Sequence, residues 1–184
     1  MHRIFKKDQI LTIPNLLSVV RLLLIPVIVW LYCGKQEYTA AVAVILLSGV
    51  TDIADGIIAR KYHMVSDFGK ILDPIADKVT QAAIILCLTY KYPLMWVLIA
   101  LFAVKEICMG LLGVVAIKKT DSVNGAKWYG KINTVVLYAV MMLLIFFQGM
   151  PVALANTLIF LCGCMMVISF LLYANFYKIL LKKS

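Results

Sequence analysis

Two apolar runs joined by a charged segment decide the fold, and residues 39–89 contain both: TAAVAVILLSGVTDIADGIIARKYHMVSDFGKILDPIADKVTQAAIILCLT. Each run is about 20 residues long, which is the length of a helix that crosses a bilayer. Five of the nine acidic residues of the chain lie within residues 52–77, where the two runs meet, and four of them are Asp52, Asp55, Asp73 and Asp77. A carboxylate at membrane depth is costly unless it is paired, hydrated or bound to a cation. The segment therefore predicts a cation-binding site at the ends of two membrane helices.

The rest of the chain extends this pattern. Apolar residues make up 64% of its 184 residues, which is typical of an integral membrane protein rather than a soluble domain. The predicted fold is all-α, with six transmembrane helices in one bundle, a single domain over residues 1–184 and a short interfacial helix at residues 2–8. The expected spans are 11–32, 39–59, 70–89, 94–117, 131–148 and 152–176.

The net charge is +9, and the basic residues are distributed as the predicted topology requires. Six crossings place the basic N-terminus, the second and fourth loops and the basic C-terminus on one side, and leave only Lys35 and Lys91 on the other. By the positive-inside rule, we expect both termini and the aspartate segment to face the cytoplasm of a multi-pass cell-membrane protein. This distribution argues against nucleic acid as a partner. The first apolar run carries Pro14, Asn15 and Arg21, and we expect it to be a retained helix rather than a signal peptide.

The spacing of the four aspartates indicates their chemistry. Asp52 and Asp55 are three residues apart, and Asp73 and Asp77 are four apart, so each pair lies on one face of its helix. Four converging carboxylates are hard oxygen ligands that suit two Mg²⁺ or Mn²⁺ ions. Arg60 is placed to bind a phosphate. The alternative is a proton or cation pathway in a small transporter, where acidic residues also lie within the membrane.

The pattern D-x2-D-G-x2-A-R-x8-G-x3-D-x3-D, from Asp52 to Asp77, resembles the signature of the CDP-alcohol phosphatidyltransferases. These are integral membrane enzymes, usually homodimers, that make phospholipid head groups. The resemblance implies that Asp52, Asp55 and Asp73 hold a first metal ion, and that Asp52, Asp73 and Asp77 surround a second. Asp77 would also remove the proton from the acceptor hydroxyl. The implied CDP pocket consists of Asn15, Asp55, Gly56, Ala59, Arg60, Ser66 and Gly69.

The identity of the acceptor alcohol is indicated by residues outside this signature. The opening Pro14-Asn15-x2-Ser18-x2-Arg21 resembles the glycerophosphate branch of the family, which implies transfer from CDP-diacylglycerol to glycerol-3-phosphate, giving phosphatidylglycerophosphate and CMP. The segment Lys131-Ile132-Asn133-Thr134 instead resembles the cardiolipin synthases, whose acceptor is phosphatidylglycerol. The resemblance assigns acceptor binding to Arg21, Lys105, Glu106 and Lys131. A structural ion pair for Arg21 and a topological role for Lys131 remain alternatives.

Overall fold

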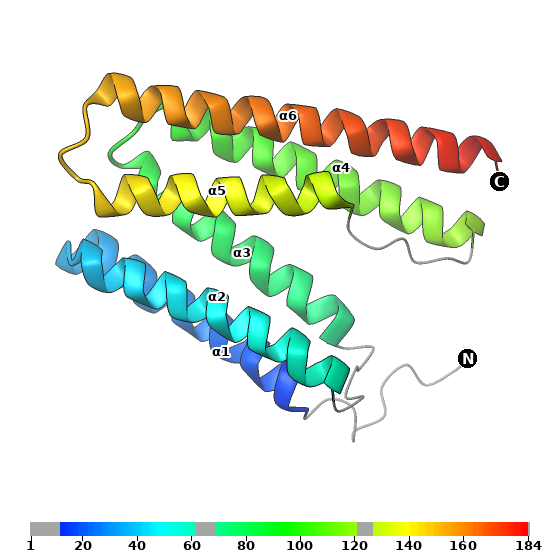
Figure 1. Ribbon diagram of the computed structural model, residues 1–184, viewed down its shortest axis with the longest axis horizontal. Coiled ribbons are helices and arrows are strands. Elements are labelled where there is room, and N and C mark those ends of the chain that lie inside the picture. The colour runs from blue at the N-terminus through cyan, green and yellow to red at the C-terminus, as the bar shows by residue number, and fades with distance from the viewer. Residues whose placement is uncertain (1–11, 62–68, 121–126, 184) are drawn as a thin grey trace. The chain divides into compact units, whose positions relative to one another are not determined.

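The computed structural model describes residues 12–61, 69–120 and 127–183, and every regular element in these ranges is helical (Figure 1). The chain divides into two compact units, residues 1–87 and 88–184. The all-α prediction is confirmed. Ser66 and the expected interfacial helix at residues 2–8 lie outside the described residues.

The first unit consists of three α-helices and one π-helical segment. They are α1 (Ile13–Val29), η2 (Trp30–Lys35), α2 (Tyr38–Lys61) and α3 (Gly69–Thr89). At the start of α1, Pro14 lies in the first turn and the Thr12 side chain accepts a hydrogen bond from the Asn15 amide at 3.5 Å. After η2 the chain reverses at Gln36, whose φ of 57° is left-handed, and the Glu37 amide donates to the Leu31 carbonyl at 3.0 Å. This reversal lays α2 along α1 (Figure 1).

The second unit contains three helices, α4 (Met95–Thr120), α5 (Trp128–Phe146) and α6 (Val152–Lys183), with α4 and α5 each packed against α6. The turns before α4 and α6 are joined, because Lys91 Nζ donates to Gln148 Oε1 at 2.7 Å. At the start of α5, Gly130 lies so close to α6 that an added Cβ would be 2.3 Å from the Tyr173 hydroxyl. Any larger residue at this position would require the Tyr173 side chain or a helix to shift.

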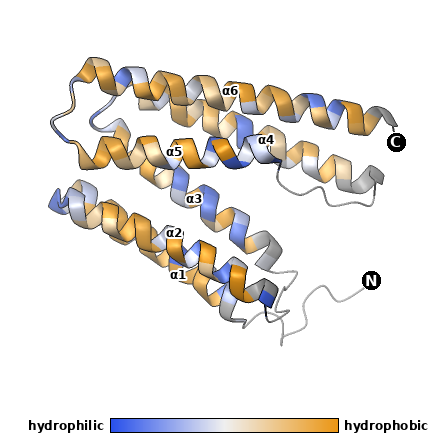
Figure 2. Ribbon diagram, viewed as in Figure 1, coloured by the Kyte–Doolittle hydropathy of each residue, from blue (hydrophilic) through white to orange (hydrophobic). Residues whose placement is uncertain are grey.

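Five helical segments in the described ranges are long and apolar enough to cross a membrane: Pro14–Lys35, Tyr38–Ile58, Met95–Ala116, Trp128–Phe146 and Val152–Leu181. They correspond to five of the six expected spans. The sixth expected span is α3, which has 21 residues but carries Lys70, Asp73, Asp77 and Lys78 in its first half. Figure 2 shows this contrast as hydrophilic residues along α3 against the mostly hydrophobic surfaces of the other helices.

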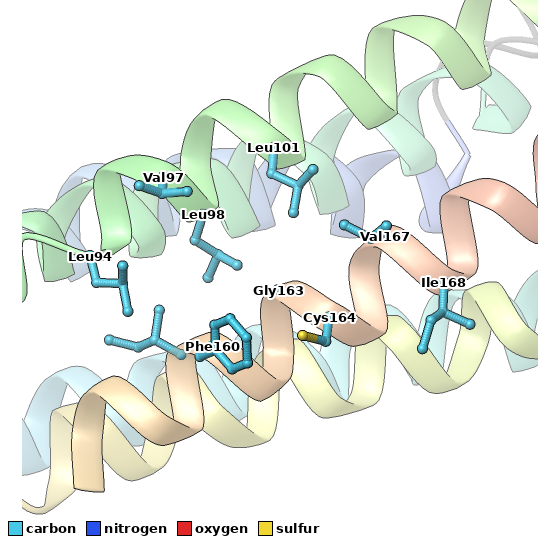
Figure 3. Close-up of a pocket in the computed structure, with 10 residues that line it drawn as sticks. Leu94, Val97, Leu98, Leu101, Phe160, Gly163, Cys164, Val167 and Ile168 are labelled. Carbon is cyan, nitrogen blue, oxygen red and sulfur yellow. The ribbon is translucent and has the colours of Figure 1, made fainter. Parts of the chain in front are cut away.

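The packing of α4 against α6 leaves a cavity of about 460 Å³ (Figure 3). Large aliphatic side chains from both helices line it, together with one phenylalanine and two small residues. The full lining is Leu94, Val97, Leu98, Leu101, Ile159, Phe160, Gly163, Cys164, Val167 and Ile168. Cys164 contributes a small side chain to this apolar lining, and none of the described cysteines forms a disulfide.

Candidate functional site

Helix α1 presents a polar stripe to the interior of the first unit. Asn15, Ser18 and Arg21 follow each other at intervals of three, and their exposed fractions are 3%, 0% and 2%. Leu16 and Leu23, on the other side of the helix, are more than half exposed. A soluble helix has the opposite arrangement, whereas a membrane helix turns its polar residues away from lipid. The stripe therefore directs polar groups of α1 toward α2 and α3.

Arg21 joins α1 to both aspartates of α2. Its Nη1 lies 2.6 Å from Asp52 Oδ1, and its Nη2 donates to Asp55 Oδ2 at 2.7 Å. The Asp55 side chain is buried, while that of Asp52 is 48% exposed. The planar guanidinium fits two carboxylates at once because its donors form a fixed fork. Arg21 therefore forms an ion pair with two carboxylates, and its expected role in acceptor binding stays a prediction.

Helix α1 also reaches the first aspartate of α3. The Ser18 hydroxyl donates to Asp73 Oδ1, and the Pro14 carbonyl at 3.1 Å is the alternative acceptor for its single hydrogen. Ser18 was not among the expected site residues, although its spacing of three from Asn15 and Arg21 was available as a signal. It fixes one of the four carboxylates from a neighbouring helix.

The second aspartate of α3 is held by its own helix. Gln81 Nε2 donates to Asp77 Oδ2 at 3.0 Å, and Lys78 Nζ lies 3.9 Å from the same oxygen. Gln81 is almost fully buried and is a second site residue that the sequence reasoning missed. The signal was its position four residues after Asp77, which places both on one helix face.

The four aspartates act on one another electrostatically. Asp52 experiences the charges of Asp73 and Asp77, and Asp55 experiences those of Asp52 and Asp73. The aspartates of α2 and α3 are therefore close enough to influence one another's charge, and their joint role as metal ligands stays a prediction. Within residues 12–61, 69–120 and 127–183, however, no three Asp, Glu, His or Cys side chains converge closely enough to form a metal-ligand shell.

The remaining expected residues of this site are placed by the backbone. Gly56 lies one residue after Asp55 in α2, Ala59 and Arg60 fall near the end of that helix, and Gly69 is the first residue of α3. The small residues thus flank the connection between the two helices.

The expected acceptor residues of the second unit lie on two helices. On α4, Lys105 is buried and its Nζ lies 2.7 Å from Oε1 of the adjacent Glu106. On α5, Lys131 is exposed. Asn133 is 3% exposed, and its Oδ1 accepts no hydrogen bond from any described residue. A buried acceptor of this kind is costly to leave unpaired, so it is a candidate contact for a ligand.

Comparison with known proteins decides the family. A CDP-alcohol phosphatidyltransferase model matches residues 11–173, which include helices of both units. The chain belongs to the CDP-alcohol phosphatidyltransferase family.

Relatives in this family carry two different names. The chain is 35% identical over 113 residues to a "Cardiolipin synthase (CMP-forming)" of Streptomyces coelicolor, an alignment that covers 58% of the chain and 53% of that relative. It is 40% identical over 81 residues to a "CDP-diacylglycerol--glycerol-3-phosphate 3-phosphatidyltransferase" of Rickettsia typhi, covering 43% and 46%. The chain thus spans about half the length of these curated relatives.

Members of this family are generally dependent on divalent metal ions. The donor chemistry here suits Mg²⁺ or Mn²⁺, because α2 and α3 carry four carboxylates, which are hard oxygen ligands.

Proposed function

We propose that this chain is a membrane enzyme that transfers a phosphatidyl group from CDP-diacylglycerol to the hydroxyl of a glycerol-based acceptor and releases CMP. The observation that carries the proposal is the gathering of Asp52, Asp55, Asp73 and Asp77 from two helices, in the spacing of the family signature. A proton or cation pathway would need the carboxylates, but not the small residues Gly56 and Gly69 at fixed distances from them.

Each aspartate has a proposed role. Asp52, Asp55 and Asp73 hold a first divalent ion, and Asp52, Asp73 and Asp77 hold a second. When bound, these ions neutralise the diphosphate of the substrate. Asp77 takes the proton of the acceptor hydroxyl, the hydroxyl oxygen bonds to the lipid-side phosphorus, and the bond from that phosphorus to CMP breaks. The proposed CDP pocket consists of Asn15, Asp55, Gly56, Ala59, Arg60, Ser66 and Gly69.

Two acceptors have support. Glycerol-3-phosphate is supported by the opening Asn15 to Arg21 and by the name of the Rickettsia relative. Phosphatidylglycerol is supported by the neutral Asn133 and by the name of the Streptomyces relative. The charges of the second unit favour phosphatidylglycerol, because Lys105 already contacts a carboxylate, and a phosphodiester with one charge needs fewer free cations than a phosphomonoester.

The assembly proposed for this reaction is one domain that includes both units, since the family match extends over helices of both. We propose that α3 is the sixth span, with both termini and the aspartate cluster on the cytoplasmic side, where water-soluble CMP is released. A homodimer in the cell membrane is the proposed oligomeric state.

The deciding experiment is an acceptor panel with purified full-length protein in lipid–detergent micelles. CMP release from CDP-diacylglycerol is measured with Mg²⁺ and either glycerol-3-phosphate, phosphatidylglycerol, serine or inositol phosphate. We expect turnover with one of the first two acceptors and its loss on chelation of the metal. The Glu37→Gln variant is the matched control, because it removes an exposed carboxylate at the far end of α2.

Other outcomes reject the proposal in distinct ways. Turnover with serine alone would exclude both anionic acceptors. Metal-dependent ion uptake into proteoliposomes, without CMP release for any acceptor, would support the transporter alternative.

A further inference from the structure

Arg21 occupies the position that a cation must take in the proposed metal site. Its guanidinium contacts Asp52 at 2.6 Å and Asp55 at 2.7 Å, and both aspartates are proposed ligands of the first ion. Arg21 and Asp55 are buried, so water screens their contact little, whereas the Asp52 side chain is 48% exposed. A divalent ion bound by these two aspartates would therefore compete with the guanidinium for their negative charge.

The pairing of Arg21 is incomplete. Its Nε and Nη1 are buried, and neither donates a hydrogen bond to any described residue, so the close approach of Nη1 to Asp52 is an ion pair without hydrogen-bond geometry. A buried donor without a partner is unfavourable, particularly on a charged group. The guanidinium thus hydrogen-bonds Asp55 but leaves two of its nitrogens unsatisfied, which favours exchange of this contact.

The neighbouring contacts make an exchange feasible without opening the unit. Ser18, one turn before Arg21, donates to Asp73 Oδ1, so α1 stays tied to α3 when Arg21 moves. Gln81 holds Asp77 from within α3 at 3.0 Å. Two of the four carboxylates are therefore oriented by neutral donors, and only the pair on α2 depends on Arg21.

We propose that Arg21 is an internal counterion that a divalent metal ion displaces from Asp52 and Asp55. This inference rests on the metal site of the proposed function. The cation exchange keeps the buried charge of the cluster compensated in both the metal-free and the metal-bound protein. Once displaced, the guanidinium is free to pair with a substrate phosphate, which is the acceptor role proposed for Arg21.

Competition between Arg21 and the ion predicts the direction in which metal affinity changes when the guanidinium is removed, and this change can be measured. If both need the same oxygens, removal of the guanidinium strengthens metal binding. If Arg21 instead only orients the carboxylates for the ion, its removal weakens metal binding, as is usual for residues that support metal ligands. The two roles predict opposite changes in the same constant.

The test is a Mn²⁺ titration of chelator-treated full-length protein in micelles, with free Mn²⁺ measured by electron paramagnetic resonance. We expect Arg21→Gln to bind Mn²⁺ about tenfold more tightly than the natural chain, a change typical of coupled sites. Thermal unfolding gives a second readout. Arg21→Gln is expected to unfold at a lower temperature without metal and to gain more from Mn²⁺ than the natural chain.

Three variants make the result decisive. Lys35→Gln removes an exposed charge from the same unit and is expected to leave Mn²⁺ affinity unchanged. Arg21→Lys keeps the charge but loses the fork, so its affinity should lie between those of Arg21→Gln and the natural chain. If Arg21→Gln does not fold, Arg21→Lys takes its place, and tighter Mn²⁺ binding than that of the natural chain is again the expected result. Mn²⁺ binding by the Arg21 variants that is equal to or weaker than that of the natural chain overturns the proposal that Arg21 is a displaceable counterion.

Failure of the metal site itself has a different signature. The natural chain must bind Mn²⁺, and Asp52→Asn must weaken that binding. If either condition fails, the proposed metal site is wrong and the counterion inference is rejected with it. If both hold while Arg21→Gln binds more weakly, only the counterion inference is rejected.

Discussion

The two units of this chain hold their helices together by different means. In the first unit, Arg21 and Ser18 of α1 contact Asp52 and Asp55 of α2 and Asp73 of α3, all through polar or charged groups. In the second unit, α4 and α6 pack around an apolar cavity. In the same unit, the buried Lys105 pairs with the adjacent Glu106. Charged contacts between helices therefore occur where the proposed chemistry needs carboxylates, and apolar packing serves elsewhere.

The comparison teaches that a buried ion pair has different consequences in the two units. Removing Asp55 leaves Arg21 with one of two partners on another helix. Removing Glu106 affects a contact between adjacent residues of α4, and the long lysine stem can carry its charge to a more polar position. The following variants test this difference, from the largest expected effect to the smallest.

The largest effect is expected for the proposed base. Asp77→Asn keeps the size of the side chain but cannot accept a proton from the acceptor hydroxyl, so turnover should fall by about 10²–10⁴-fold. CMP release under saturating substrates measures it. The control is Glu106→Gln, an equivalent change in the second unit, which we expect to alter the KM for the acceptor more than kcat. Unchanged turnover in a folded Asp77→Asn protein would refute the assignment of the base.

The next effect concerns stability without metal. Asp55→Ala leaves the buried Arg21 guanidinium with Asp52 alone and should cost about 3–5 kcal/mol of unfolding free energy. Denaturant unfolding in micelles measures it. Glu37→Ala, at an exposed carboxylate of the same unit, should change stability by less than about 0.5 kcal/mol.

The same measurement on Glu106→Ala sharpens the comparison between the units. We expect a loss of about 1 kcal/mol, in the usual range for a hydrogen-bonded contact, because Lys105 retains conformational freedom. Equal losses for Asp55→Ala and Glu106→Ala would mean that the two ion pairs play the same structural role, contrary to the comparison.

The close approach of α5 and α6 predicts an intermediate effect. In Gly130→Ala, the new Cβ would lie 2.3 Å from the Tyr173 hydroxyl and 2.9 Å from its ring, so a helix or the ring must shift. The Lys127 amide donates to that hydroxyl at 3.0 Å, which restrains the ring. We expect a loss of about 1–3 kcal/mol, as for other overpacked sites.

A second glycine of the same unit is the matched control for this change. An added Cβ at Gly113 would lie 3.7 Å from the Tyr177 hydroxyl, an ordinary contact. Gly113→Ala should therefore be close to neutral in the same unfolding assay. A loss as large as that of Gly130→Ala would show that any side chain on these faces is harmful, and that the approach at Gly130 is not special.

The sequence predicted most of the fold because each membrane helix is marked by a long apolar run that can be recognised without knowledge of the tertiary structure. The bounds of α2, α3 and α4 lie within three residues of the expected spans, since apolar runs, glycines and charged loops mark both ends. It also predicted that Asp52, Asp55, Asp73 and Asp77 gather. Residues that act on these aspartates were harder to predict.

Ser18, Gln81 and the pairing of Arg21 depend on how three helices rotate about their axes. Periodicity shows that Asn15, Ser18 and Arg21 share a face, but not which aspartate each one meets. Local spacing does suggest the contact between Gln81 and Asp77, although many such pairs on helices make no contact of consequence. Only the arrangement of α1, α2 and α3 gives these three residues their partners.

Gln81 provides the smallest predicted effect on turnover and tests whether the orientation of the proposed base matters. Gln81→Met keeps the volume but removes the donor to Asp77 Oδ2, so the carboxylate loses one of its restraints. We expect kcat to fall by about tenfold, at the lower end for residues that orient a functional group. The KM for CDP-diacylglycerol should stay unchanged, because Gln81 is not a proposed contact of that substrate.

The neighbouring Thr80 separates orientation from simple packing. Thr80 is as buried as Gln81, but its hydroxyl donates to the Ala76 carbonyl of its own helix at 2.8 Å. Thr80→Val therefore removes a buried hydrogen bond from α3 without touching Asp77, and kcat should not change. If both variants lower kcat equally, the loss reflects disturbed packing of α3. A loss confined to Gln81→Met would instead show that the hydrogen bond to Asp77 contributes to turnover.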